Sequence, residues 1–350
     1  MNPADLPRTV AHAVCRAVED GELGGAAVPE RVVVERTRPG GVGEYASPVA
    51  FQVARGARLR PADVAAVLAR RLNGVPGIGR VEVTGPGFVN FVLPALSAPE
   101  VIASLAAVRP SPTRPTALRP SAPHPTAPCP AAPPAAPAGV AAGLRERVVH
   151  EAVVRIAHTQ SPRQDAPGAP APGAPGAPAP GAPAPVAPVP PRDGDVLARY
   201  GNDAARWAML TGPAREAPAF SERLLVQGED NDFFRVRYAF SRSRALLRNA
   251  RDLGFTPAVG EVDDARALLR SLADHPLVLE AAAHHRAPER LARHLVELAD
   301  ALLDFQYRVL PQGDEKPSAA HRARLALAEA AGTVLAGGLS LLGIDAPERL

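Results

Sequence analysis

The chain has 350 residues, which suggests two or three domains, and its 46% hydrophobic content is sufficient for packed cores. A net charge of +3, from 39 basic and 36 acidic residues, gives no sign of nucleic-acid binding from overall charge. The two cysteines, Cys15 and Cys129, form no CxxC pair, so neither a disulfide framework nor a zinc site is expected.

The first 95 residues predict a small α+β domain. Leu6, Val10, Val14 and Val18 recur every four positions, which indicates a helix over residues 6–20. A β-branched run then predicts a strand at 31–36. Two further helices are expected at 46–55 and 61–72, followed by a hairpin with strands at 80–84 and 88–93.

Residues 96–193 are predicted to be a linker, because most of the 41 prolines lie there and such sequence cannot bury enough apolar surface to fold. Within it, Val140, Leu144, Val148 and Ile156 share a four-residue spacing that predicts one amphipathic helix at 139–160. Three interpretations stay open for this helix. It packs on a flanking domain, docks a protein partner, or is only marginally ordered.

Residues 194–350 predict an all-α bundle. Gly254 and Gly343 are expected to end two of its helices. The predicted helices are 195–211, 232–253, 263–274, 276–285, 288–310 and 319–342. No apolar run approaches the roughly 18 residues that a membrane span needs, and no signal peptide opens the chain. A soluble, cytoplasmic protein without membrane contact is therefore expected.

One predicted helix concentrates positive charge. Residues 232–251 contain six arginines and no acidic residue after Asp232. At about 100° per residue, the apolar positions form one arc. Arg235 and Arg242 flank it on one side, and on the other lies a row of four arginines. This pattern suits a helix that packs on a bundle and presents guanidinium groups to phosphates. The row consists of Arg237, Arg244, Arg248 and Arg251.

An aromatic side chain accompanies these arginines. Tyr238 falls among the polar positions, where its ring could stack on an exposed base. A purely structural interpretation is also available, because residues 193–350 carry 20 basic and 23 acidic residues and the arginines could pair with those acids. Composition alone leaves both interpretations open.

The carboxyl-terminal half resembles the DALR anticodon-binding domain of arginyl-tRNA synthetases. Residues 238–242 (YAFSR) resemble the Y-A-H-A-R element of that family, with Phe240 and Ser241 in place of His and Ala. Residues 290–310 resemble a family helix that ends in an aromatic pair, here Phe305 and Tyr307, and residues 334–350 resemble the family's terminus. The resemblance implies an anticodon contact through Arg237, Tyr238, Arg242, Arg244, Arg248 and Tyr307.

The amino-terminal 95 residues resemble the amino-terminal domain of the same enzymes. Residues 81–91 (VEVTGPGFVNF) are similar to the family's V-E-V-A-G-P-G-F-I-N-F hairpin, and residues 43–50 are similar to its G-D-Y-A-T-N-x-A stretch. In the family this domain rests on the tRNA elbow. The resemblance implies that Phe88 and Asn90 meet a D-loop nucleotide, unless they serve only to pack the hairpin.

The catalytic middle of a class I synthetase has no counterpart in these motifs. No His-x-Gly-His element occurs, and the single lysine, Lys316, lies in a carboxyl-terminal loop, so a lysine-rich catalytic loop cannot be formed. Residues 200–207 resemble only the helix that leads into the anticodon domain. The predicted protein is therefore not an enzyme, has no catalytic residues, and uses no cofactor or metal.

The sequence thus predicts an α+β protein with three parts: residues 1–95, a linker at 96–193 with a helix at 139–160, and a bundle at 194–350. The leading hypothesis is a non-catalytic paralogue of arginine–tRNA ligase that binds tRNA, with arginine tRNA as the expected partner. Two alternatives remain. One is an accessory subunit that supports aminoacylation in trans, and the other is a protein-interaction module whose RNA-binding surfaces have decayed.

Overall fold

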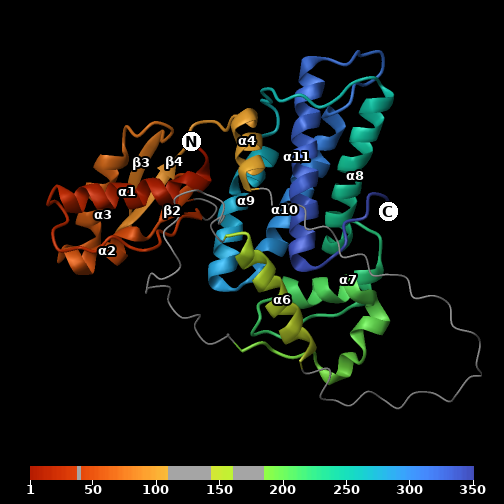
Figure 1. The fold of residues 1–350 in the computed structure, drawn as a ribbon, viewed down its shortest axis with the longest axis horizontal. Helices are drawn as coiled ribbons and strands as arrows, with labels where there is room; N and C mark the ends of the chain where they lie inside the picture. Colours follow the sequence, from red (N-terminus) through yellow and green to blue (C-terminus); the bar gives the residue numbers. More distant parts are fainter. Residues whose placement is uncertain (38–40, 109–142, 161–184) are drawn as a thin grey trace, which may run out of the picture. The chain divides into compact units, whose positions relative to one another are not determined.

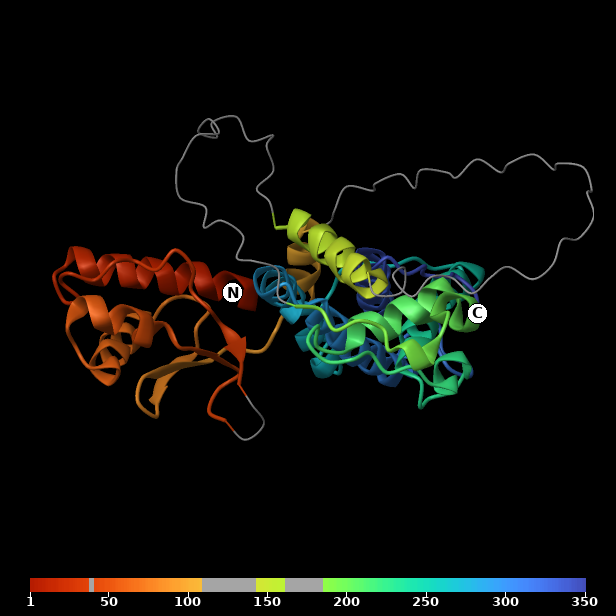
Figure 2. The ribbon, with the colours of Figure 1, turned by 90° about the horizontal axis from the view of Figure 1, so that it is seen from below.

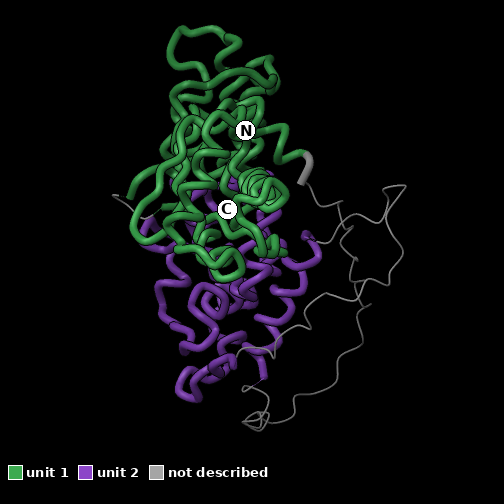
Figure 3. The backbone as a smooth tube through the Cα atoms, turned by 90° about the vertical axis from the view of Figure 1, so that its left-hand side faces the viewer, with its two compact units in different colours: residues 1–107, 242–278, 301–332 green, residues 108–241, 279–300, 333–350 purple. Residues whose placement is uncertain are grey.

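The computed structural model describes residues 1–37, 41–108, 143–160 and 185–350. The chain divides into two compact units, which are coloured in Figure 3. Unit 1 comprises Met1–Ala107, Arg242–Val278 and Ala301–Gly332, and unit 2 comprises Val108–Ser241, Leu279–Asp300 and Thr333–Leu350.

The amino-terminal part of unit 1 contains an antiparallel sheet with the strand order β1-β2-β4-β3. The predicted hairpin is confirmed, with Val81 opposite Phe91 and Thr84 opposite Phe88. β2 was not predicted, because its residues were assigned to the start of a helix; it pairs with β4 instead. The strands are β1 (Glu35–Arg36), β2 (Tyr45–Ser47), β3 (Arg80–Thr84) and β4 (Phe88–Val92).

Three helices cover one face of this sheet, as Figures 1 and 2 show: α1 (Leu6–Glu19), α2 (Val49–Ala57) and α3 (Pro61–Leu72). Alternation along β4 directs Val89 and Phe91 into the core beneath them, where both are fully buried. Asn90 consequently belongs to the opposite face of the strand, whereas Phe88, the first residue of β4, has its ring against Phe51 of α2.

A further helix, α4 (Ala98–Val108), follows the sheet. These residues were expected to be extended linker, so the expectation is wrong here. Asn2 Nδ2 donates a 2.6 Å hydrogen bond to Ser104 Oγ, and Val101 and Leu105 are buried. Tertiary packing therefore supports a helix in a stretch whose prolines are confined to its first turn and beyond its end. The remaining linker tracts, 109–142 and 161–184, lie outside the described residues.

A buried polar contact in unit 1 joins the sheet to the carboxyl-terminal helices. The Tyr45 hydroxyl donates a short hydrogen bond to the Asp274 carboxylate, and Arg36 Nη1 lies 3.4 Å from the other oxygen of that carboxylate. Burial, and secondarily the negative charge of Asp274, raises the pKa of Tyr45. The phenol therefore stays protonated and remains a donor at neutral pH.

We expect Tyr45→Phe to destabilise unit 1 by about 2 kcal/mol, because it removes a hydrogen bond to a buried charged group while keeping the ring. Thermal unfolding followed by circular dichroism measures the effect. Tyr307→Phe is the matched control, since the Tyr307 side chain is 70% exposed and should leave the midpoint unchanged. Equal midpoints for the two variants would contradict a structural role for the Tyr45 hydroxyl.

The carboxyl-terminal helices agree with the predicted all-α region, and the α+β fold class is confirmed. One difference is α9, which continues through Pro276 where two helices were expected, and another is that α10 ends before a short 3-10 turn, η4. Gly254 and Gly343 adopt the left-handed conformation expected of helix stops. The elements are α8 (Asp232–Asp252), α9 (Arg266–His285), α10 (Pro288–Phe305), η4 (Gln306–Arg308) and α11 (Ala319–Leu342).

The last helix bears on the expectation about membranes. By length and composition, α11 is apolar enough to cross a membrane, with a mean hydropathy of 1.7 over its most apolar window. The statement that no run approaches this length is therefore wrong. Since 61% of that window is buried inside the structure, α11 has the burial of a helix in the core of a bundle.

Unit 2 contains the helix predicted within the linker, α6 (Leu144–His158), which packs on α7 (Val196–Thr211). Val148, Ala152 and Ile156 are buried on its apolar face. Arg155 Nε donates to the carbonyl of Leu341, and Arg206 Nη2 donates to Glu151 at 2.8 Å. Of the three interpretations, intramolecular packing is the one observed, and a protein partner on this apolar face is no longer proposed.

The contact that fastens α6 is a fully buried arginine. Arg145 donates hydrogen bonds only to backbone carbonyls among its recorded contacts, and burial lowers the pKa of its guanidinium. Most of the acceptors lie in the segment that follows α7. They are the carbonyls of Met209 (3.1 Å), Ala187 (3.0 Å), Gly212 (3.4 Å), Pro213 (3.0 Å), Ala214 (3.3 Å) and Glu216.

Candidate nucleic-acid interface

The arginine-rich helix is α8, and its burial follows the predicted arc. Val236, Ala239 and Ala250 are completely buried along the apolar stripe. The arginines on both flanks are partly exposed, and Arg251 at the end of the helix is exposed. Because α8 rises about 1.5 Å per residue, Arg237, Arg244 and Arg248 span roughly 16 Å along one side of the helix. Such a row is long enough to meet several phosphates of one strand.

A cavity of about 510 Å³ opens at the amino-terminal end of α8 within unit 2. Its walls carry aromatic rings together with amide, carboxylate and guanidinium groups, a combination that suits a polar aromatic ligand such as a nucleobase. The residues that line the cavity come from the start of α7, the segment before α8, the first turns of α8, and the carboxyl terminus. The lining includes Tyr200, Asn202, Gln227, Phe233, Phe234, Arg237, Asp345 and Leu350.

The kink in α7 shapes one wall of this cavity. Gly201 has φ 76° and ψ 165°, a conformation that only glycine adopts readily, and it interrupts the helical dihedrals inside α7. The helix consequently changes direction next to Tyr200 and Asn202, which line the cavity on either side of Gly201. A larger residue at position 201 would be strained by its backbone alone.

Arg237 is the only basic residue in the cavity wall among the described residues. Its guanidinium carbon lies 5.1 Å from the centroid of the Phe233 ring, a cation–π distance that holds the charge in place. Its Nε is buried and has no hydrogen-bond partner within the described part of the chain. The side chain is thus positioned but has donor capacity left for a ligand oxygen.

Tyr238 presents a ring at the surface, as predicted. It is 36% exposed, and its ring stacks on Phe234 with centroids 5.5 Å apart and planes inclined by 15°. Phe234 also lines the cavity, so the stacked pair extends from the cavity wall to solvent. An unstacked base could continue this stack without distortion of the helix.

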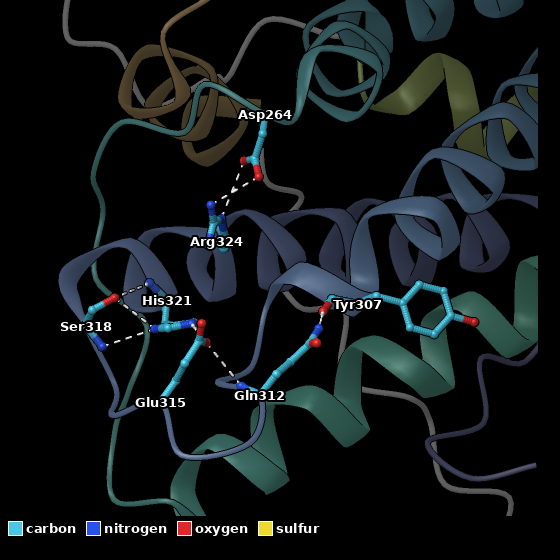
Figure 4. Close-up of polar contacts among 7 residues, drawn as sticks. All are labelled: Asp264, Tyr307, Gln312, Glu315, Ser318, His321 and Arg324. Carbon is cyan, nitrogen blue, oxygen red and sulfur yellow. Dashed lines mark hydrogen bonds and ion pairs between the residues drawn. The ribbon is translucent and has the colours of Figure 1, made fainter.

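Arg242 and Tyr307 belong to unit 1 and have different environments. Arg242 Nε donates a 2.7 Å hydrogen bond to Gln306 Oε1, so this arginine is held by η4. In Figure 4 the Tyr307 ring points away from the polar contacts that fix the following loop, including the Ser318–His321 and Asp264–Arg324 bonds. Tyr307 is 70% exposed, whereas Phe305 is buried in the core.

Arg244 and Arg248 lie on the same side of α8 as Arg237, one and two positions further along the row. Both are partly exposed, and Arg244 already makes an interaction within the protein. The three arginines are therefore available to different degrees. Their role in binding stays a prediction.

The two residues predicted to contact the tRNA elbow differ in solvent exposure. Phe88 is 39% exposed, but Asn90 is only 3% exposed. The Asn90 amide nitrogen donates a 2.7 Å hydrogen bond to Thr84 Oγ1 and longer bonds to the carbonyls of Glu82 and Phe88. Asn90 therefore stabilises the hairpin from inside, the alternative that was left open, and Phe88 alone offers a ring to a ligand.

Sequence reasoning missed several residues of this region. Phe234 lies four positions before Tyr238, a helical spacing that could have revealed the stacked pair. Gln227 and Asp345 reach the cavity from parts of the chain more than 100 residues apart, and no local pattern brings them together. Gln306 was likewise hidden between the two aromatic residues that drew attention.

Among the described residues, no three His, Cys, Asp or Glu side chains gather as a metal-binding group. Cys15 is a free thiol, and Cys129 lies outside the described residues.

Comparison with protein families defines the class of protein. Residues 5–93 match the "Arginyl tRNA synthetase N terminal domain", and residues 236–350 match the "DALR anticodon binding domain". The sheet domain and the helices from α8 onward are thus the two kinds of domain that the sequence resemblance implied. The chain therefore carries an arginyl-tRNA synthetase amino-terminal domain followed by a DALR anticodon-binding domain.

One solved structure has a similar fold. The arginyl-tRNA synthetase of Thermus thermophilus aligns with 99% of this chain and 100% of its own, with a TM-score of 0.61 and 16% sequence identity. A protein described as an arginyl-tRNA synthetase of Campylobacter jejuni aligns with 45% of this chain and 35% of its own, with a TM-score of 0.38 and 22% identity. At 16% identity the first likeness concerns the fold alone, and the second supports no conclusion.

Proposed function

We propose that this protein binds tRNA without catalysing aminoacylation, using the cavity and arginine row of α8 for the anticodon stem-loop and the amino-terminal domain for the elbow. The observation that carries the proposal is the cavity at the start of α8, where Arg237 is held over Phe233 with an unused buried donor beside the exposed Tyr238 stack. A flipped base and its phosphate would meet these groups together.

The two matched domains support this proposal independently of the cavity. One domain description names an arginyl-tRNA synthetase and the other names anticodon binding, so tRNA is the partner that both favour. Arginine tRNA is the member of that class that we propose, because the amino-terminal domain is of the arginyl-tRNA synthetase type.

The absence of catalysis is proposed from the sequence itself. The chain has no His-x-Gly-His element, and its one lysine, Lys316, lies in the polar loop between η4 and α11. Adenylate formation needs cations that hold the ATP phosphates as charge develops on them. Neither of the two motifs that supply them in class I synthetases can be formed by this sequence.

Binding of an arginine tRNA transcript, measured by fluorescence anisotropy at several salt concentrations, tests the proposal. We expect a Kd that rises steeply with salt, because each neutralised phosphate contributes about 0.7 to 0.9 to the logarithmic slope. No binding of any tRNA at low salt would contradict the proposal. It would favour a protein-interaction module instead.

The same preparation should transfer no arginine to tRNA in the presence of ATP. Detectable transfer by the protein alone would refute the non-catalytic part of the proposal. If transfer appears only after a separate catalytic synthetase is added, and exceeds that of the added enzyme alone, the accessory-subunit alternative is correct.

A further inference from the structure

An exposed aromatic pair lies at one end of the sheet, where the hairpin meets α2. The rings of Phe51 and Phe88 meet edge to face, with centroids 5.1 Å apart and an interplanar angle of 63°. Phe51 is 36% exposed and Phe88 is 39% exposed, so the pair is supported on one side and open to solvent on the other. Rigid, half-exposed rings of this kind are suited to stacking on an unpaired base.

Arginines adjoin this pair. Arg55 lies one helical turn after Phe51 on the exposed face of α2, and Arg58 directly follows the last residue of that helix. Among the described residues, neither arginine makes an ion pair, although Arg60 is paired with Asp63 at 2.8 Å. Two guanidinium groups are therefore left uncompensated beside the rings.

The hairpin turn brings the connection between α2 and α3 to the same place. A Cβ atom at Gly87 would lie 2.8 Å from the Cβ of Pro61, so the turn rests directly on the first residue of α3. Residues 58–60 precede that contact. The elements that carry these residues therefore meet at one end of the domain: α2 with Phe51 and Arg55, the α2–α3 connection with Arg58, and β4 with Phe88.

We propose that this surface, and not the pair Phe88 and Asn90, is the part of the amino-terminal domain that contacts RNA. An unstacked base of an RNA loop stacks on Phe51 and Phe88, and Arg55 and Arg58 bind the phosphates on either side of it. Charge complementarity selects RNA as the occupant, because an apolar protein partner would leave both guanidinium groups without compensation. The inference rests on the proposed function and assigns it residues that the sequence motif did not indicate.

The test compares a full arginine tRNA transcript with its isolated anticodon stem-loop, which lacks the elbow. For the double variant Arg55→Glu and Arg58→Glu of the full chain, we expect about tenfold weaker binding of the full tRNA. The salt slope should fall by about 1 to 2, while binding of the stem-loop is unchanged. The control is Arg8→Glu with Arg16→Glu, the same charge change at exposed positions of α1.

A second variant separates the rings from the charges. Phe51→Leu keeps the apolar volume but loses the aromatic face, so we expect about tenfold weaker binding of the full tRNA and unchanged binding of the stem-loop. Phe51→Tyr keeps an aromatic ring and should bind the full tRNA as tightly as the wild type does. If the wild type binds both RNAs and the variants bind the full tRNA as the control does, the inference is wrong and the proposed function stands. If the wild type binds neither RNA, the proposed function itself fails. If the variants abolish capture of a protein but not of tRNA, the surface is a protein interface.

Discussion

Replacing Arg145 by methionine should destabilise unit 2 by at least about 3 kcal/mol. The substitution removes the donor that six backbone carbonyls share. The Pro213 and Ala214 carbonyls still accept hydrogen bonds from backbone amides, but the other four lose their donor in a buried site. Each unsatisfied buried acceptor costs about 1 to 3 kcal/mol where water cannot reach it. The expected loss of stability is smaller than the sum of these costs, because the variant will relax and let water reach some of the carbonyls. Arg145→Lys should be intermediate, since an ammonium has three donors and cannot serve six acceptors.

The chain provides its own reporter for this experiment. Its single tryptophan, Trp207, is buried in α7 two residues before Met209, whose carbonyl accepts the Arg145 Nε hydrogen. Urea unfolding followed by Trp207 fluorescence therefore reads the stability of unit 2. Arg147→Met is the matched control, because Arg147 lies two positions along the same helix and is exposed. Similar midpoints for the two variants would show that the carbonyl contacts do not stabilise α6 on α7.

The success of the sequence predictions depended on how local their causes were. The apolar spacing of residues 6–20 and the Gly85-Pro86-Gly87 turn carry their own signals, so α1 and the hairpin could be predicted from short windows. β2 could not, because only its pairing with β4 makes residues 45–47 a strand. The same holds for Pro276, where tertiary packing keeps α9 continuous despite the lost hydrogen bond.

In the candidate site, too, the features with local causes were predictable and those that depend on distant residues were not. The helical period placed Arg237 and Tyr238 correctly on the accessible sides of α8, because the arc of buried residues determines where the others lie. The period could not show that Arg242 is held by Gln306, which is 64 positions away. The hydrogen bond of Asn90 could not be predicted for a similar reason. Its place on a strand gives the face of the sheet, but Thr84 across the hairpin decides where its amide donates.

Reversing the charge of Arg237, Arg244 and Arg248 together to Glu should weaken tRNA binding by roughly 100-fold, or about 2.7 kcal/mol, at moderate salt. These three residues form one side of α8 beside the exposed Tyr238 ring, so the change replaces three phosphate attractions with three repulsions. The logarithmic salt slope should fall in magnitude by about 2, since anticodon-loop phosphates each contribute about 0.7. Anisotropy of a labelled arginine tRNA at several salt concentrations measures both quantities.

The control for this variant must carry the same change in net charge. Arg16→Glu, Arg266→Glu and Arg293→Glu provide it, because all three are exposed and lie outside the α8 row. We expect the control to bind tRNA within a few-fold of the wild type, since screening at moderate salt confines charge effects to about 10 Å. Trp207 fluorescence verifies that unit 2 is folded in each variant, because Trp207 packs on Phe233 at a centroid distance of 5.8 Å. If the α8 variant is folded and binds tRNA as tightly as this control, the arginine row makes no RNA contact. Because Arg237 belongs to both the row and the cavity wall, the proposed anticodon contact at α8 would then be wrong.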